Sequence, residues 1–327
     1  MTRITRRSAI ALSLASVSGR AFGQSPLREI SVGLSSKSFG TAAPRLADEM
    51  GLFGQHGLRM RFVSLDSGST AQSALVSGSI ELVLSGPGEL LAAQARGIKV
   101  VAIAKTAAGL SGSLILSQAA ATRLQMSATA PITERLKAID GLLIASPSPT
   151  SSYTGSFKGA ADAAGSKPRF TYMAQSAMPA ALESGSIQGY IAGAPFWATQ
   201  VTQGTAILWI SGPKQEISEK HVPASSGSLQ TTRQFADANP QAIRNIQQAL
   251  NEFASTVDSN PAAVKAALAK LYPELDSKTI DLLFSTESAA WKSQSMSKED
   301  MVHDIEMMKA SGIPKIDQVQ PQAAIYP

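Results

Sequence analysis

Small polar residues and glycines recur where apolar, strand-like segments end and helical patterns begin. These residues are Ser35, Ser36, Gly68, Ser69, Ser85, Gly86, Ser148, Ser152, Gln175 and Ser176. A helix start presents unpaired N–H groups and a partial positive charge, which together bind an anion without an arginine. Each residue alone is also an ordinary helix cap. If the helix starts converge, the set favours a carboxylate, sulfonate or similar oxyanion head.

Aromatic residues near the same turns are candidate walls for the body of a ligand. They are Phe39, Tyr153, Phe196 and Trp197, the last two directly after Pro195. A flat ligand can stack on such rings, whereas aromatic residues in the first turn of a helix often pack into their own lobe. Lys37 is the cation in the first of these loops. It either pairs with a ligand anion or stays solvated.

Groups for catalysis or metal binding are scarce. The chain has no cysteine and three widely spaced histidines, which excludes thiolate chemistry and disfavours a histidine-rich metal site. Asp66 and Glu89 are the acidic residues in the expected strand-end loops. We interpret both as structural, since a carboxylate is favoured at a turn or in a first helical turn. The sequence therefore predicts no catalytic residue, no metal and no cofactor.

An internal repeat organises these residues. The segment Ala-Leu-Val-Ser-Gly-Ser-Ile-Glu-Leu-Val-Leu-Ser-Gly-Pro (74–87) recurs as Ala-Leu-Glu-Ser-Gly-Ser-Ile-Gln-Gly-Tyr-Ile-Ala-Gly-Ala (181–194), at an offset of 107 residues. The same offset relates Ser69 to Ser176 and Gly97 to Gly204. Two copies of one unit are too few for a solenoid and indicate a protein of two similar lobes. A cleft between lobes is where ligands bind.

Strand-like and helical segments alternate along the chain, which is typical of a parallel sheet covered on both faces. The expected strands are residues 30–34, 58–65, 80–84, 100–104, 142–145, 169–173, 187–192 and 206–210. Gly51 is expected to end the first helix with a positive φ, and Pro87 to open a later one. Helical periodicity dominates after Gln234, and we expect these helices to pack on the first lobe.

We therefore expect an α/β fold with two doubly wound lobes of parallel or mixed sheet, joined by a two-segment hinge. The first lobe would hold residues 24–117 and 219–327, and the second residues 118–218. Residues 110–117 and 221–230 would carry the chain between lobes, so that a ligand can bias their opening angle. Ligands in open sheets bind beyond the carboxyl ends of the strands, which places the site in the cleft.

The first residues are typical of an export signal. Arg3, Arg6 and Arg7 precede a short apolar run, and Ala21-Phe22-Gly23 forms a small-x-small cleavage site, so residues 1–23 are a predicted signal peptide cleaved near Gly23. A Sec and a twin-arginine signal both remain open. Residues 1–23 contain four arginines, the fourth being Arg20, and no acidic residue, so their removal lowers the formal charge from +5 to +1. The mature chain then lacks the basic field of a nucleic-acid-binding protein, and we expect a soluble periplasmic monomer.

A set of spaced motifs resembles a known family. It comprises Pro44-x-x-Ala47, Gly51-Leu52-Phe53-x-x-x-Gly57-Leu58, Gly68, Ala74-Leu75-x-Ser77-Gly78-x-Ile80-x-Leu82 and Gly97-Ile98-x-Val100-Val101. The chain resembles periplasmic substrate-binding proteins of ABC importers with the type II fold, in the sulfonate/nitrate/taurine branch, although Glu81 stands where that branch usually has aspartate. The resemblance implies capture of a small molecule between the lobes and delivery to a membrane permease.

Two other functions stay open at this point. An enzyme on the same scaffold would need a base, nucleophile or metal set in the cleft, which the sequence does not offer. A ligand-sensing protein that signals to a membrane partner would have the same sequence features. The resemblance does not fix the ligand either, because the family includes proteins that bind aromatic carboxylates and pyrimidine precursors.

Overall fold

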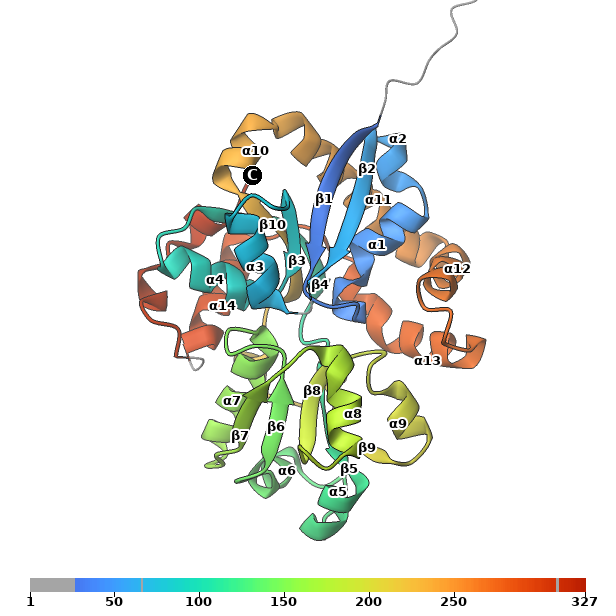
Figure 1. Cartoon of the computed structure of the whole chain (residues 1–327), viewed down its shortest axis with the longest axis vertical. Helices are drawn as coiled ribbons and strands as arrows, with labels where there is room; N and C mark the ends of the chain where they lie inside the picture. Colours follow the sequence, from blue (N-terminus) through green and yellow to red (C-terminus); the bar gives the residue numbers. More distant parts are fainter. Residues whose placement is uncertain (1–26, 66, 310–311) are drawn as a thin grey trace, which may run out of the picture.

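The computed structural model describes residues 27–65, 67–309 and 312–327. The predicted signal peptide and Asp66 lie outside these residues. The described chain forms two α/β lobes, one above the other in Figure 1. Each lobe is built on its own five-stranded sheet. Among the described residues, no helix combines the length and the apolarity needed to cross a membrane.

The first sheet has the strand order β2-β1-β3-β10-β4. Its strands are β1 (Arg28–Leu34), β2 (Leu58–Ser64), β3 (Leu82–Ser85), β4 (Val100–Ala108) and β10 (Ser225–Thr232). β1 pairs in parallel with β2 and β3, and β10 is antiparallel to both β3 and β4. The buried strand interiors are nearly all apolar, as expected for a sheet covered on both faces.

The second sheet repeats this plan with the order β7-β6-β8-β5-β9. Its strands are β5 (Gly112–Ser117), β6 (Leu143–Ser146), β7 (Arg169–Tyr172), β8 (Gly189–Gly193) and β9 (Ala206–Ile210). β5 is the antiparallel strand here, placed between β8 and β9 as β10 is placed between β3 and β4. The expected repeat is thus confirmed: β3 and β8 occupy equivalent positions in two separate sheets.

Helices cover both faces of each sheet. They are α1 (Ala42–Glu49), α2 (Leu52–Gln55), α3 (Gly68–Val76), α4 (Pro87–Ala95), α5 (Gln118–Leu124), α6 (Ile132–Ala138), α7 (Ser152–Ala163), α8 (Met178–Glu183), α9 (Ala198–Thr202), α10 (Arg233–Ala238), α11 (Pro240–Ser259), α12 (Pro261–Leu271), α13 (Ser277–Glu287) and α14 (Lys298–Met308). Gly51 ends the first helical segment with φ of 76°, and Pro87 opens α4, as the sequence predicts.

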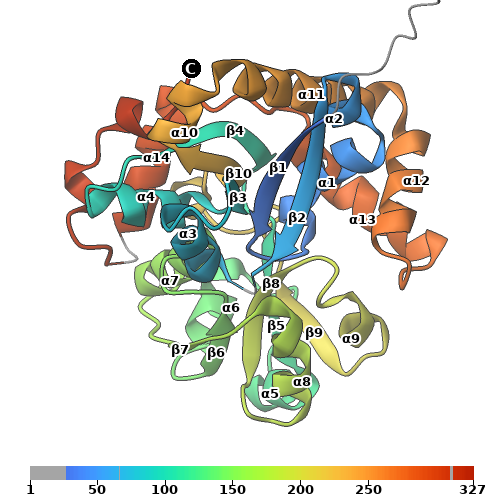
Figure 2. The same ribbon diagram turned by 45° about the horizontal axis from the view of Figure 1, so that its top comes forward.

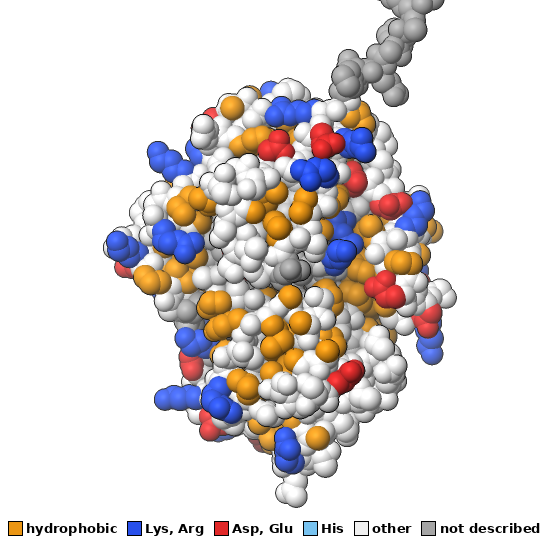
Figure 3. Space-filling model, viewed as in Figure 1, with side chains coloured by type: hydrophobic (Ala, Val, Ile, Leu, Met, Phe, Trp, Pro, Cys, Tyr) orange, Lys and Arg blue, Asp and Glu red, His pale blue; other side chains and the backbone are white. Residues whose placement is uncertain are grey.

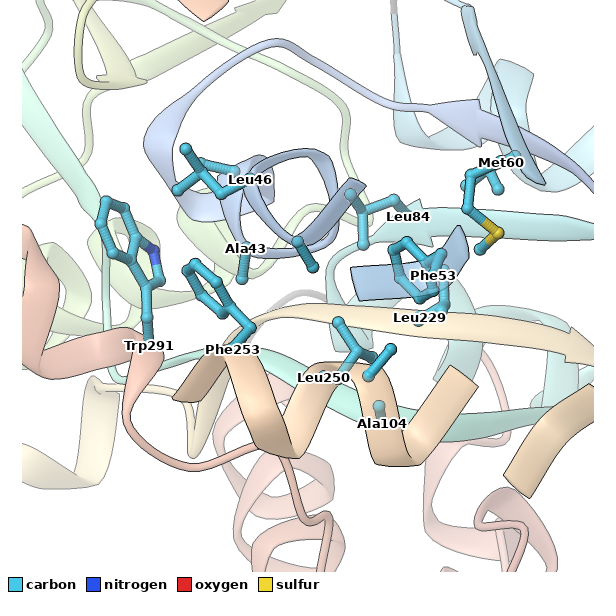
Figure 4. Packing of buried hydrophobic residues seen from close by; sticks show 14 of the residues in the cluster. Ala43, Leu46, Phe53, Met60, Leu84, Ala104, Leu229, Leu250, Phe253 and Trp291 are labelled. Atoms are coloured by element: carbon cyan, nitrogen blue, oxygen red, sulfur yellow. The ribbon is translucent and has the colours of Figure 1, made fainter. Parts of the chain in front are cut away.

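The C-terminal helices pack on the first lobe, also as predicted. Helices α11, α12 and α13 lie on the side of α1, whereas α14 lies beside α4 (Figures 1 and 2). Leu250 and Phe253 of α11 reach the sheet core near Leu84 and Leu229 (Figure 4). All four side chains are fully buried. Each such burial stabilises the fold by about 1.5–3 kcal/mol. Helix α14 additionally contacts α7 of the second lobe.

The chain crosses between lobes in two places, which differ from the expected boundaries. The sequence predicts that residues 112–117 belong to the first lobe, but they form β5 of the second sheet, so the first crossing is residues 109–111. The second crossing is residues 211–224, and β10 beyond it completes the first sheet. The predicted lobe boundary is wrong for a physical reason. An antiparallel strand inserted into a parallel sheet and a buried linker are both extended and apolar, so the local sequence does not distinguish them.

Helix α14 holds the second crossing through two side chains. Asp304, fully buried, accepts a hydrogen bond from the Ala224 backbone N–H (2.7 Å). The neighbouring His303 Nε2 contacts the Val222 carbonyl oxygen at 2.6 Å. Burial raises the pKa of the Asp304 carboxyl to about 8, and the hydrogen bond from Ala224 only partly opposes the shift. The folded chain therefore holds this proton more tightly than the unfolded chain.

The first prediction concerns Asp304→Asn. Protonated Asp304 contributes stability that is complete below about pH 4 and is lost as the pH rises to about 8. The amide that replaces the Asp304 carboxyl in the variant has no proton to lose in this range. Between pH 5 and pH 8 the free energy of unfolding should therefore decrease less in the variant than in the wild type, and the two decreases should differ by about 1–3 kcal/mol. Urea unfolding at both pH values measures the difference. Glu306→Gln, an exposed change on the same helix, should behave like the wild type, and equal pH slopes in all three proteins would contradict the prediction.

Candidate functional site

The lobes meet at the carboxyl ends of their parallel strands, and two adjoining cavities lie between them. The inner cavity has a volume of about 30 Å³. Its lining is polar and comprises Ser35, Ser36, Ser38, Gly40, Thr41, Gly68, Ser85, Gly86, Glu89, Pro147, Ser151, Ser152, Tyr153, Gln175 and Ser226. The outer cavity, of about 170 Å³, is lined by Ser35, Ser36, Lys37, Ser64, Gln175, Ser176 and Phe196. Shared lining residues make the two cavities parts of one cleft.

The loop after β1 forms one wall of the cleft, and internal hydrogen bonds fix its shape. The Thr41 hydroxyl donates to the carbonyl oxygens of Ser36 (2.8 Å) and Ser38 (3.0 Å). From outside the loop, the Tyr272 hydroxyl donates to the Lys37 carbonyl oxygen (2.8 Å). These bonds occupy carbonyl groups and leave the Ser36 and Ser38 hydroxyls, 2.9 Å apart, at the inner cavity.

The start of α4 places an acidic side chain in the inner cavity. Glu89 is 4% exposed. Its Oε2 accepts from the Ser85 hydroxyl (3.3 Å), and its Oε1 accepts from the Ser148 hydroxyl of the second lobe (2.8 Å). Burial raises the pKa of Glu89 above its ordinary value, and the hydrogen bond from Ser148 opposes that shift. One carboxyl group thus joins the two lobes inside the cleft.

The second lobe contributes the start of α7 and the loop before α8. The Ser151 hydroxyl caps α7 by accepting from the Tyr153 N–H (3.2 Å). The Tyr153 hydroxyl lies 2.7 Å from the Ser111 hydroxyl of the first crossing. Burial raises the pKa of Tyr153 to about 12, so the phenol stays protonated at neutral pH. Gln175 Oε1 accepts from the Gly193 N–H (2.9 Å), which fixes the side chain at the junction of the two cavities.

The lobes are in direct contact around the cleft. The Phe39 N–H of the first lobe donates to the Ala194 carbonyl oxygen of the second (2.7 Å). A Cβ atom added to Gly88 of α4 would lie 1.8 Å from the Thr150 carbonyl oxygen. The space-filling view shows the lobes touching, with lysine and arginine side chains scattered over both (Figure 3). The structure is therefore a closed arrangement, with little room beyond the two cavities.

Comparison with protein families shows where this architecture belongs. The model of the NMT1-like family matches residues 24–272. The chain belongs to the NMT1-like family. A comparison with curated protein sequences finds no match.

Solved structures share the two-lobed fold at low sequence identity. The alkanesulfonate-binding protein SsuA from Xanthomonas axonopodis pv. citri, bound to MOPS, aligns with a TM-score of 0.73 and 18% identity over 92% of this chain and 99% of its own. The periplasmic nitrate-binding protein NrtA from Synechocystis PCC 6803 aligns with a TM-score of 0.68 and 14% identity over 91% of this chain and 87% of its own. The periplasmic aliphatic sulphonate binding protein SsuA from Escherichia coli aligns with a TM-score of 0.64 and 17% identity over 91% of this chain and 98% of its own. These matches confirm the expected fold of periplasmic binding proteins.

The structure gathers most of the predicted ligand-binding residues at the cleft. Those that line either cavity are Ser35, Ser36, Lys37, Gly68, Ser85, Gly86, Ser152, Tyr153, Gln175, Ser176 and Phe196. Ser148 stands behind the lining and donates to Glu89. The convergence of helix starts from both lobes, inferred from the repeat, is therefore present. Contact of these residues with a ligand stays a prediction.

Four predicted residues lie elsewhere. Phe39 is fully buried in the first-lobe core, in contact with the rings of Tyr272 and Trp291. Ser69 is exposed, and its hydroxyl pairs with that of Ser67. Trp197 packs against the cores of both lobes, and Pro195 before it is half-buried outside the cavity linings. Phe39 and Trp197 therefore pack against the cores and do not line the cleft cavities.

Sequence reasoning missed the role of Glu89 and the contribution of β10. The sequence places Glu89 at an expected strand-end loop, but a carboxylate in the first turn of α4 is favourable for the helix alone, so we interpret it from the sequence as structural. Ser226 reaches the inner cavity from β10, a strand that the sequence placed partly in a linker. Among the described residues, no cluster of three or more His, Cys, Asp or Glu side chains could hold a metal ion.

The second prediction tests the close approach of the lobes at Gly88. Gly88→Ala should hold the lobes apart, because its Cβ would meet the Thr150 backbone rather than a movable side chain. Small-angle X-ray scattering should give a larger radius of gyration for the variant than for the wild type. Gly54→Ala is the matched control, since nothing lies within 4 Å of a Cβ there. Identical scattering from Gly88→Ala and the wild type would contradict the closed arrangement.

Proposed function

We propose that this chain is the solute-binding component of an ABC importer and captures a small organic anion in the cleft between its lobes. The observation that carries the proposal is the pair of cavities at the carboxyl ends of two equivalent sheets, joined by two crossings. Such an arrangement lets a ligand contact both lobes and bias their opening. The names of the similar structures, which include sulfonate- and nitrate-binding proteins, support the same reading.

The anionic end is assigned to the outer cavity. Lys37 and Ser176 line it from opposite lobes, and Ser35 and Ser36 extend it inward. Lys37 is exposed, so it can pair with an entering acid without first losing an internal partner. Phe196 supplies an apolar wall for the body of the ligand. A carboxylate or sulfonate head fits these groups.

The proposal includes the setting of the protein. We propose a monomeric periplasmic protein, released from its signal peptide near Gly23, that delivers its solute to a membrane permease. Binding without chemistry is supported by the lining of the cleft: serine and threonine hydroxyls dominate, and the pKa of Tyr153 is too high for a base at neutral pH. A sensing partner in place of a permease would use the same cleft.

The third prediction is a binding test with a repeat-matched control. Sulfonates, aromatic carboxylates, nitrate and pyrimidines are screened by thermal shift on the mature chain, and hits are measured by calorimetry. A ligand at 100 times its Kd should stabilise the wild type by about 2.7 kcal/mol. Ser176→Trp should weaken binding at least tenfold, because the indole would fill the outer cavity. Ser69→Trp, at the equivalent position of the first lobe, should not, since Ser69 is exposed away from both cavities.

Two outcomes would count against the proposal. If no compound in the four classes stabilises the wild type, the chain does not bind a small organic anion. If hits bind Ser176→Trp as tightly as the wild type, they bind outside the outer cavity. Circular dichroism of both tryptophan variants checks that each is folded.

A further inference from the structure

The inner cavity holds a carboxyl group that no cation of the described residues accompanies. Glu89 takes part in no ion pair among the described residues, and no lysine or arginine within that part of the chain lines the inner cavity. Its hydrogen bonds come from uncharged groups, among them the hydroxyls of Ser85 and Ser148. A buried carboxylate is costly unless it is paired and fully hydrogen-bonded. A positively charged or N–H group in this cavity would stabilise the ionised carboxylate.

The backbone around Glu89 is shaped to keep its carboxyl group in place. A Cβ atom at Gly68 would lie 2.6 Å from Glu89 Oε1, and one at Gly86 would lie 3.3 Å from Oε2. Any side chain at position 68 would thus displace the carboxyl group. The two glycines, predicted as ligand contacts for their exposed N–H groups, form the recess in which this acid sits.

A second polar group at the same cavity is unused. Ser226 is 7% exposed, lines the inner cavity, and its hydroxyl has no hydrogen-bond partner in the structure. The donors to the Glu89 carboxyl, which are the hydroxyls of Ser85, Ser148 and Thr150 and its own backbone N–H, are all uncharged. The inner cavity thus presents the Glu89 carboxyl of α4, which no cation among the described residues pairs with, and the unpartnered Ser226 hydroxyl of β10.

We propose that the inner cavity binds a nitrogen group of the solute, an amino, amidine or ring N–H group that donates to the Glu89 carboxyl and contacts the Ser226 hydroxyl. The inference rests on the proposed function and narrows it. An anionic head in the inner cavity would meet a carboxyl group and no cation, whereas Lys37 lines the outer cavity, so the acid of the solute lies in the outer cavity and its nitrogen in the inner one. Glu89 is then the residue that separates nitrogen-bearing solutes from otherwise similar acids.

The position of Glu89 also links recognition to closure. Its Oε1 is held by Ser148 of the second lobe, so a nitrogen group bound there contacts a side chain that both lobes stabilise. A solute without the nitrogen leaves the carboxyl group unpaired in the closed cleft. Discrimination against such a solute is therefore expected to be large, because a buried polar group without its partner is penalised more than a missing methylene.

The fourth prediction uses matched pairs of compounds that differ by one amino group. The pairs are 4-aminobutanoate and butanoate, 3-aminobenzoate and benzoate, 3-aminopropanesulfonate and propanesulfonate, and 4-aminopyrimidine and pyrimidine. Calorimetry on the wild type should show at least a tenfold preference for the amino member of one or more pairs. Glu89→Gln, of equal size, should lose that preference, Glu89→Asp should keep part of it, and Glu49→Gln, at an exposed ion pair, should leave it unchanged.

The outcomes separate this inference from the proposed function. Equal or tighter binding of the members without the amino group to the wild type overturns the inference and leaves the solute-binding proposal standing. A preference that survives in folded Glu89→Gln also overturns it, since another group must then read the nitrogen. If no member of any pair binds the wild type, the inference fails, and the screen described above decides whether the binding proposal fails with it. The wild-type preference alone tests the inference if Glu89→Gln does not fold.

Discussion

The structure depends on one constraint: each lobe completes its sheet with a strand that arrives directly from the other lobe. β5 follows β4 after a short crossing and enters the second sheet between β8 and β9. β10 follows β9 through the second crossing and enters the first sheet between β3 and β4. Both crossings are therefore anchored in the middle of sheet hydrogen bonding. The lobes can rotate about the crossings, but neither can separate from the other without breaking strand pairs.

This connection explains why the cleft is polar. Parallel strands deliver their loops and the following helix starts to one edge of each sheet, and the two crossings keep those edges opposed. Serine and threonine hydroxyls in these loops satisfy backbone groups and still face the cavity, as with Ser36, Thr41 and Ser151. Small residues at the contact, above all Gly88, let backbone meet backbone when the lobes are together. The one acid at the centre, Glu89, then sets the electrostatic character of the inner cavity.

Much of this architecture could be predicted from the sequence, for identifiable reasons. The 107-residue repeat located β3 and β8, and the apolar segments located the other strands except β5 and β10, each end to within four residues, because buried strands are nearly continuous apolar runs. The repeat also brought Ser85, Gly86, Gln175 and Ser176 to the cleft. The repeat also predicts Ser69 at the cleft, as the counterpart of Ser176. In the structure Ser176 lines the outer cavity, whereas Ser69 lines neither cavity.

The remaining features depend on tertiary contacts that local patterns do not encode. β5 and β10 resemble linkers until their partners in the opposite lobe are known. Phe39 and Trp197 are aromatic residues at turns, and the sequence alone does not show whether they face the cleft. In the structure Phe39 packs against Trp291, and Trp197 packs against the cores of both lobes. Glu89 is favourable in its helix turn whether or not a cavity lies before it. Its partner Ser148 lies in the other lobe, 59 residues along the chain.

The most direct test of the account measures the distance between the lobes when a solute binds. The chain has no cysteine, so Ser73→Cys and Ser184→Cys, both at exposed positions of different lobes, can carry one spin label each. Pulsed electron paramagnetic resonance is recorded without ligand and with the panel compound that binds the wild type most tightly. If the free chain populates both open and closed arrangements, closure on the cleft predicts that the compound raises the closed fraction, which shortens and narrows the distance distribution. An unchanged distribution in a sample that calorimetry shows to be saturated would contradict binding between the lobes.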